Sequence, residues 1–249
     1  MNLEVILSPA ELPTLAQRNL RATACVVFDV LRATSTFATA LQNGAREIIP
    51  VSEIPEAIQF KKQRPEVLLG GERQGVRISA GGVDFDLGNS PREYTPEKVR
   101  GKTIVSTTTN GTRALRACAG AKVILAASFL NLNATAEFLR QHRFESVLLV
   151  CAGTGENPAD EDIIAAGALV DALLPGKETH SKRTDSAIAA RAAYFEAVRT
   201  GLDRKISLSE NAQRLLSLPE LRDDVAFCLQ RDIYPLVAKM GIDGVIRRL

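Results

Sequence analysis

Short apolar runs of strand length alternate with helix-like segments along most of the chain, and this alternation limits the possible folds more than any other feature. The strand-like runs are Met1–Ser8, Ala24–Phe28, Glu47–Val51, Val67–Leu69, Lys102–Ser106, Lys122–Ala127 and Ser146–Cys151. The helix-like segments are Thr36–Asn43, Ser52–Arg64, Thr112–Cys118, Asn133–His142 and Glu161–Leu174. Repeated β–α units of this length favour a largely parallel sheet that helices cover on both faces. The sequence therefore predicts an α/β fold.

The last quarter of the chain departs from this alternation. Residues 184–229 are mostly helical in pattern, and Ile233–Val237 and Val245–Ile246 are candidates for late strands. This helical stretch fits either a separate lobe or a covering layer. No linker rich in Gly, Ser or Pro marks a domain boundary. We therefore expect a single domain over residues 1–249, with a mainly helical portion at about residues 180–230.

Composition and charge exclude several classes of function. Lys and Arg total 31 against 29 Asp and Glu, so the net charge of +2 gives no global field for nucleic acid or for an anionic membrane. No apolar stretch reaches the roughly 20 residues that cross a bilayer. The amino terminus has an acidic residue and stops at Pro9, unlike a signal peptide. The four cysteines are far apart, and Cys25 and Cys151 lie in apolar runs, which indicates reduced core thiols. We expect a cytoplasmic protein.

A strand, a charged turn and a helix start meet around Asp29. The carboxylate ends the run Ala24–Phe28 and is followed by Arg32, Thr34 and Ser35. Open α/β sheets bind ligands at the carboxyl ends of their strands, and helix starts there attract anions. A carboxylate at such a position suggests a metal ion shared with the anion. Asp29 could equally cap the helix, and Arg32 could form a surface ion pair, so this cluster alone leaves both interpretations open.

Three further polar clusters follow strands. Gly71–Arg73 also fits a plain turn with a solvated ion pair. Ser106–Arg113 combines hydroxyls, an amide and an arginine at a helix start, which favours anion binding. Cys151–Gly155 has glycines that let backbone amides approach a ligand. The acidic residues after it, including Glu161 and Asp162, fit the start of a helix and become metal ligands only if they converge with Asp29.

A long glycine-rich segment, Gly70–Tyr94, interrupts the alternation. Loops of this length are usually functional or disordered. The apolar residues Val83, Phe85 and Leu87 in this segment can pack against the rest of the fold, so we interpret it as an ordered wall of an active site.

The sequence lacks the residues that several other kinds of active site require. The Asp29 strand is similar to that of haloacid-dehalogenase phosphatases, but Leu31 stands where those enzymes need a second Asp. No P-loop motif is present. His142 and His180 lie outside every polar cluster, so zinc and histidine catalysis lack candidates. Cys151 lacks the arginine spacing of cysteine phosphatases and is better interpreted as a buried thiol.

Five motifs occur together and in order, and they carry a family resemblance. They are Asp29–Thr36, Gly71–Arg73, Phe85–Pro91, Thr108–Arg113 and Cys151–Thr154. With these motifs the chain, from about Leu3 to its carboxyl end, resembles the 2-phosphosulfolactate phosphatases, a magnesium-dependent family named for a step of coenzyme M biosynthesis. The resemblance implies a three-layer α/β/α fold with a mixed sheet. It also implies hydrolysis of a phosphate monoester to give 3-sulfolactate. The run from Gly155 to Asp160 departs from the family pattern and bears on the substrate more than on the reaction.

Together the residues and the resemblance give one hypothesis for the site. A Mg²⁺ ion would be held by Asp29 and Glu161 first, with Asp162 or Glu72 next. Asp29, Arg32 and Glu161 would be catalytic, with charge neutralisation and positioning as the main contributions. Substrate binding would involve Arg32, Ser35, Arg73, Asn89, Ser90, Thr108, Asn110, Gly111, Arg113 and Thr154.

The expected partner is a small anionic phosphorylated substrate, without nucleic acid or membrane, and a homodimer is possible. Three alternatives remain open: a phosphatase of a related phosphorylated hydroxy acid, a nucleotide-dependent transferase, and a non-catalytic protein that binds sulfonate or phosphate.

Overall fold

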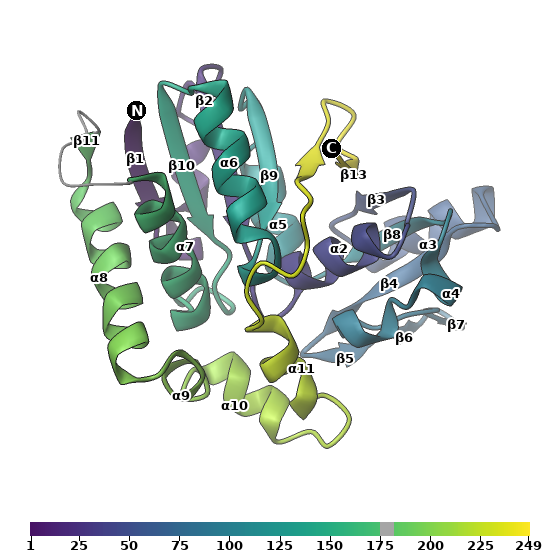
Figure 1. Cartoon of the computed structure of the whole chain (residues 1–249). Helices are drawn as coiled ribbons and strands as arrows, with labels where there is room; N and C mark the ends of the chain where they lie inside the picture. The colour runs from purple at the N-terminus through teal and green to yellow at the C-terminus, as the bar shows by residue number, and fades with distance from the viewer. Residues whose placement is uncertain (175–181) are drawn as a thin grey trace.

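A long mixed sheet runs through the computed structural model, which describes residues 1–174 and 182–249 (Figure 1). His180 therefore lies outside the described residues. Within them, eleven strands form the main sheet in the order β11-β1-β10-β2-β9-β12-β13-β3-β8-β4-β5. The strands are β1 (Asn2–Ile6), β2 (Thr23–Phe28), β3 (Glu47–Pro50), β4 (Leu68–Arg73), β5 (Val76–Arg77), β8 (Thr103–Thr107), β9 (Val123–Ala127), β10 (Ser146–Cys151), β11 (Lys182–Arg183), β12 (Ala238–Met240) and β13 (Ile246–Arg248). The predicted α/β fold with a mixed, largely parallel sheet is confirmed.

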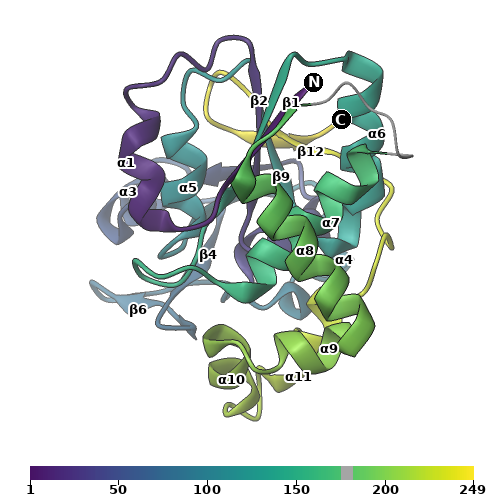
Figure 2. The ribbon, with the colours of Figure 1, turned by 90° about the vertical axis from the view of Figure 1, so that its left-hand side faces the viewer.

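Helices cover both faces of this sheet. The α-helices are α1 (Leu12–Leu15), α2 (Ala33–Gln42), α3 (Ile54–Gln63), α4 (Pro96–Val99), α5 (Gly111–Ala117), α6 (Leu132–His142), α7 (Asp160–Leu173), α8 (Asp185–Thr200), α9 (Leu202–Ile206), α10 (Glu210–Leu216) and α11 (Arg222–Cys228). Figure 2 shows α1 and α5 on one side of the strands and α6, α7 and α8 on the other. The three layers expected from the resemblance are therefore present.

The central strands are buried on both faces, which explains their unbroken apolar composition. Every residue of β2 is buried. Val26 and Phe28 pack in the core beneath α6 and α7, whereas Cys25 and Val27 pack in the core beneath α1 and α5. Successive side chains of a strand point to opposite faces, so one apolar run supplies both cores. This arrangement holds the residue that follows β2 at the edge of the sheet.

The carboxyl-terminal hairpin β12–β13 reverses the direction of the sheet halfway across. Strand β12 is antiparallel to β9, and β13 is antiparallel to both β12 and β3. Strands β3, β8 and β4 therefore run opposite to β1, β10, β2 and β9. Only one residue pair, Ile246 with Ile48, joins β13 to β3. Figure 1 shows the two groups lying at a steep angle to each other, which brings the carboxyl ends of both toward one region.

One late strand differs from its prediction. Residues Ile233–Val237 were expected to form a strand, but the strand is Ala238–Met240. Pro235 has no N–H to donate to a ladder, and the N–H of Tyr234 donates to Leu130 O at 2.9 Å instead. The segment therefore packs beside the start of α6 before joining the sheet.

The helical stretch and the glycine-rich segment both lie near the strand ends. Helices α8 to α11 follow one another between residues 185 and 228. The segment Gly70–Tyr94 contains the end of β4, the short strand β5 and a separate hairpin of β6 (Ser79–Ala80) and β7 (Val83–Asp84). Its residues Phe85 and Leu87 are buried, so it is an ordered part of the fold.

Candidate active site

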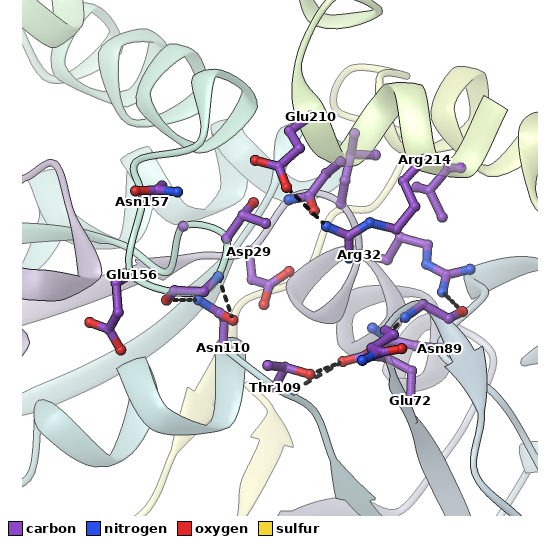
Figure 3. A pocket seen from close by; sticks show the side chains of 18 residues that line it. Asp29, Arg32, Glu72, Asn89, Thr109, Asn110, Glu156, Asn157, Glu210 and Arg214 are labelled. Atoms are coloured by element: carbon purple, nitrogen blue, oxygen red, sulfur yellow. Dashed lines mark hydrogen bonds and ion pairs between the residues drawn. The ribbon is translucent and has the colours of Figure 1, made fainter. Parts of the chain in front are cut away.

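A cavity of about 360 Å³ lies where the carboxyl ends of the two strand groups meet (Figure 3). Its walls come from the residues after β2, β8 and β10, from the end of β4 and the turn after it, and from α10. The lining residues are Asp29, Leu31, Arg32, Glu72, Gln74, Gly75, Asn89, Thr109, Asn110, Gly153, Thr154, Gly155, Glu156, Asn157, Glu210, Asn211, Arg214 and Leu215. The strand-end clusters that are remote in sequence thus line a single cavity.

Asp29 both caps α2 and faces the cavity. Its Oδ1 accepts the N–H of Ala33 at 3.0 Å, and its backbone carbonyl accepts the N–H of Thr34 at 2.9 Å. The other oxygen, Oδ2, lies 2.7 Å from the position that a Cβ on Gly111 would occupy, so a side chain there would press on the carboxylate. Burial, followed by repulsion from Glu72 and Glu161, raises the pKa of Asp29 to about 7.

Glu161 lies fully buried in the first turn of α7. Its Oε1 accepts a hydrogen bond from Asn211 Nδ2 at 2.8 Å, whereas its Oε2 has no hydrogen-bond partner among the described residues. Burial raises its pKa, although the bond from Asn211 opposes the rise. A buried carboxylate oxygen without a partner is costly, and a bound cation would satisfy it.

The other two predicted metal ligands hold loops in place. Asp162 accepts the N–H of Val30 at 2.8 Å with Oδ1 and the N–H of Gly153 at 3.0 Å with Oδ2, which ties the loop after β2 to the loop after β10. Burial and the nearby Glu161 and Asp29 raise its pKa well above the usual range for Asp. Its two oxygens are therefore engaged in positioning the backbone.

Glu72 plays a similar part on the other side of the cavity. Its Oε1 accepts hydrogen bonds from the N–H of Thr109 at 2.9 Å and from the Thr109 hydroxyl at 3.0 Å. Its Oε2 accepts the N–H of Gly75 at 2.7 Å. Glu72 thus links the turn after β4 to the loop after β8, and all three contacts anchor cavity-lining segments.

The charges around the cavity favour a cation there. Four acidic side chains line the cavity against two arginines. Glu161 does not line the cavity, but it is buried behind Asn211 and near enough to Asp29 to raise the pKa of that carboxyl. Across the residues from 1 to 174 and from 182 to 249, no three His, Cys, Asp or Glu side chains form a ready-made metal cage. Mg²⁺ needs none, because it keeps several waters and is commonly held by one or two carboxylates with substrate phosphates. Asp29 and Glu161 fit that pattern, as hard oxygen ligands whose mutual repulsion an ion would relieve.

Arg32 lines the cavity, but its guanidinium is already hydrogen-bonded to other parts of the protein. Its side chain is 2% exposed and donates to Asp224 Oδ2 at 2.7 Å and to Gly75 O at 2.7 Å. Asp224, on α11, also accepts the hydroxyl of Ser90 at 2.7 Å. The surface ion pair considered for Arg32 is instead a buried one. A guanidinium has five N–H donors, so Arg32 retains donors for a ligand.

Two predicted arginines lie outside the cavity. Arg73 donates to Glu72 O at 2.7 Å and to the Thr107 hydroxyl at 2.9 Å, so it braces the ends of β4 and β8. Arg113 forms an ion pair with Glu156, with side chains 40% and 65% exposed. Glu156 is at the rim of the cavity, and Figure 3 shows its carboxylate pointing away from Asp29, so its pair with Arg113 is exposed to solvent.

The predicted hydroxyl and amide ligands divide into two groups. Asn89, Asn110 and Thr154 line the cavity, and Gly111 lies against Asp29. Three predicted hydroxyls have partners within the fold instead: Ser35 donates to Val30 O at 2.8 Å, Ser90 donates to Asp224, and Thr108 pairs with Thr112 at 3.2 Å.

Comparison with known proteins matches the motifs to one family. The family model described as 2-phosphosulpholactate phosphatase matches residues 8–241. The chain belongs to this family. A relative from Thermotoga petrophila, named a probable 2-phosphosulfolactate phosphatase, is 46% identical over 222 residues, which cover 88% of this chain and 89% of the relative. Relatives of the same name are 40% identical in Caldanaerobacter subterraneus, over 92% of each chain, and 35% identical in Clostridium tetani, over 99% and 100%.

The resemblance inferred from the five motifs is thereby confirmed, and the family name describes a phosphoric monoester hydrolase. Four residues of α10 that line the site of this family member were missed by sequence reasoning, namely Glu210, Asn211, Arg214 and Leu215. They lie in the helical stretch of residues 184–229, for which the sequence predicts either a lobe or a covering layer. No motif predicts them. The only sequence signal is the four-residue spacing of Glu210 and Arg214, which is typical of an ion pair on a helix.

Cys151 and His142 lie where the sequence predicted, one in the core and the other exposed at a helix end. Cys151 is buried, and burial together with nearby Asp162 raises the pKa of its thiol well above its usual value, so a thiolate nucleophile is disfavoured. His142 is exposed and contacts Phe138 O at the end of α6. All four cysteines are buried and free. None of the described helices combines the length and apolar character that a membrane crossing needs.

Proposed function

We propose that this chain is a Mg²⁺-dependent phosphatase that hydrolyses 2-phosphosulfolactate to 3-sulfolactate and inorganic phosphate. The names of its relatives support the substrate. The observation that carries the metal dependence is the unpartnered, buried Oε2 of Glu161 near the cavity-facing carboxylate of Asp29. An anionic substrate entering a cavity lined by more acids than arginines needs added positive charge.

In this proposal, Asp29 and Glu161 hold the ion. When bound, Mg²⁺ supplies charge neutralisation for the phosphoryl group and polarises its oxygens. The reaction forms a P–O bond to a water oxygen and breaks the P–O bond to the ester oxygen, which leaves as the hydroxyl of the product. The protein contributes mainly by holding these atoms in line.

The remaining side chains orient the substrate. Arg32, held by Asp224 and the Gly75 carbonyl, directs its free N–H groups from a rigid position. Asn110 is held by the carbonyls of Ala152 and Gly155, at 2.8 and 3.0 Å, so it maintains the shape of the loop after β10. A preorganised donor such as Arg32 loses little entropy when substrate binds.

Release of inorganic phosphate tests the proposal. We expect turnover of 2-phosphosulfolactate with Mg²⁺, loss of turnover after treatment with EDTA, and recovery when Mg²⁺ is added back. Turnover that persists in EDTA would contradict the metal dependence. Equal turnover of 2-phospholactate, which lacks the sulfonate, would instead favour a phosphatase of a related phosphorylated hydroxy acid.

A non-catalytic binding protein would bind the substrate and release no phosphate under any metal condition. The buried acids argue against it, because a pure anion binder gains nothing from carboxylates beside its ligand. A nucleotide-dependent transferase would show saturable nucleotide binding in equilibrium dialysis. A role in coenzyme M biosynthesis, a cytoplasmic location and a homodimer stay predictions, and sedimentation of the purified protein tests the homodimer.

A further inference from the structure

Helix α10 forms the wall of the cavity that faces the strand ends (Figure 3). Ser209 caps the start of the helix, because its hydroxyl accepts the N–H of Ala212 at 3.3 Å. Two contacts hold the helix against the rest of the protein: Asn211 donates to Glu161 at 2.8 Å, and Leu215 is buried in the core. Because α10 is anchored to Glu161 itself, its cavity-facing side chains hold a defined position relative to the proposed metal ligands.

Arg214 of α10 is the least engaged arginine that lines the cavity. Its one polar contact within the described residues is with Glu210, at 3.4 Å, and the two side chains are 37% and 67% exposed. Exposed pairs of this helical spacing contribute little to stability. Arg32, in contrast, is buried in an ion pair with Asp224. Arg214 can therefore exchange Glu210 for a bound anion with little loss.

The stem of Arg214 lies on the turn that organises the opposite wall. Its Cδ is 3.8 Å from the position that a Cβ on Gly75 would occupy. Gly75 donates its N–H to Glu72 and accepts Arg32 through its carbonyl. The stem of Arg214 thus lies against the Gly75 turn, and its guanidinium lies at the cavity beside Glu210 of the same helix, on the side away from Asn110 and Glu156 (Figure 3).

The proposed substrate carries three anionic groups. Its phosphoryl group would lie by Asp29 and Glu161. The carboxylate is on the adjoining carbon, whereas the sulfonate is on the arm that extends farther from the phosphorylated carbon. With the phosphoryl group at the strand ends, we therefore assign the longer arm, which ends in the sulfonate, to the wall formed by α10. A planar guanidinium donates two parallel hydrogen bonds to such an oxyanion.

We propose that Arg214 binds the sulfonate of the substrate and thereby selects sulfonated over non-sulfonated phosphate esters. This inference rests on the proposed function. It assigns sulfonate recognition to the helical stretch rather than to Arg73 or Arg113, which the fold engages elsewhere.

The test compares Arg214→Ala with the wild type on two esters that differ only in the sulfonate, 2-phosphosulfolactate and 2-phospholactate. We expect kcat/KM for 2-phosphosulfolactate to fall roughly 10- to 100-fold, mainly through KM, as for a lost hydrogen bond to a charged group. The value for 2-phospholactate should change less than about 3-fold. Arg214→Lys, which keeps the charge but not the paired donors, should recover part of the loss.

Calorimetric binding of the product, 3-sulfolactate, gives a readout that needs no turnover. Its affinity should fall by a similar factor in Arg214→Ala. The matched control is Arg199→Ala, which removes an exposed arginine from a comparable intrahelical pair with Glu196, away from the cavity, and should leave both measurements unchanged.

Equal losses on both esters, or no loss on either, would overturn the role of Arg214. If the wild type released no phosphate from 2-phosphosulfolactate, the proposed function would fail. The binding of 3-sulfolactate would then test the role of Arg214 by itself. Binding of 3-sulfolactate that depends on Arg214 would support the sulfonate site, and absence of binding would refute it.

Discussion

The substitution Asp29→Asn tests whether the buried charge of Asp29 lowers the free energy of unfolding. Burial and neighbouring carboxylates raise the pKa of Asp29 from 3.8 to about 7. The unfolded chain therefore releases this proton near pH 4, whereas the folded protein retains it until about pH 7. Between these values the folded state binds more protons, so the free energy of unfolding falls as the pH rises.

The size of the effect follows from the shift. About three pKa units at roughly 1.4 kcal/mol each give an upper value of about 4 kcal/mol above pH 7. Asn has the same shape, keeps an acceptor for the N–H of Ala33 and carries no charge to repel Glu72 or Glu161. We expect metal-free Asp29→Asn to be more stable than the wild type at pH 8, by up to about 4 kcal/mol, and nearly equal to it at pH 4. For a chain of this size, a difference of about 4 kcal/mol corresponds to a difference of roughly 8–16 °C in melting temperature.

Urea unfolding from pH 4 to 8, in EDTA, measures the difference. Under the proposed function, saturating Mg²⁺ should reduce it, because an ion held by Asp29 would stabilise the folded wild type by binding. The variant should also lose most phosphatase turnover while remaining folded. Asp203→Asn, at an exposed carboxylate on α9, is the control and should change stability by less than about 0.5 kcal/mol. A stability difference that does not depend on pH would refute the reasoning.

Three further substitutions test other parts of the site. Arg113→Ala should change kcat/KM for phosphate release less than about 3-fold, because its partner Glu156 is an exposed side chain at the rim; a larger loss would return Arg113 to substrate binding. Asp224→Ala should lower the free energy of unfolding in urea by about 3–5 kcal/mol, because Arg32 would remain buried and unpaired. Replacing both, as Arg32→Met with Asp224→Leu, should recover stability but not activity. Gly71→Ala should lower the free energy of unfolding, measured by thermal unfolding, by about 2–4 kcal/mol, because φ is +143° and the new Cβ would lie 2.1 Å from Thr107 O. The control is Gly82→Ala, where no atom lies within 4 Å of the new Cβ, and it should lower the free energy of unfolding by only about 1 kcal/mol.

The part of the site that follows strand ends could be predicted from the sequence. Strands β2 and β10 are buried on both faces, so they appear as apolar runs whose ends are sharp, and both end at the expected residues Phe28 and Cys151. Because the residues after such strands lie at one edge of a sheet, Asp29 and Thr154 could be expected to line one cavity.

The arginines could not be assigned in the same way. A guanidinium reaches several ångströms from its Cα, and the acceptors of Arg32, Arg73 and Arg113 come from segments that only the tertiary fold brings near. Asp224, the partner of Arg32, is 192 residues away in the chain. The reversal of the sheet could not be predicted from the sequence either, because it depends on two three-residue strands at the carboxyl end.

This reversal explains how one cavity is built from both strand groups. In a flat sheet, the carboxyl ends of antiparallel groups would lie at opposite edges, and Glu72 could not approach Asp29. The short hairpin β12–β13 joins the groups through a single pair with β3, which permits the steep angle between them (Figure 1). The carboxylates that then meet repel one another, as the raised pKa of Asp29 shows. Buried repulsion of this kind is characteristic of functional sites, and a divalent cation is the ligand that would convert it into binding energy.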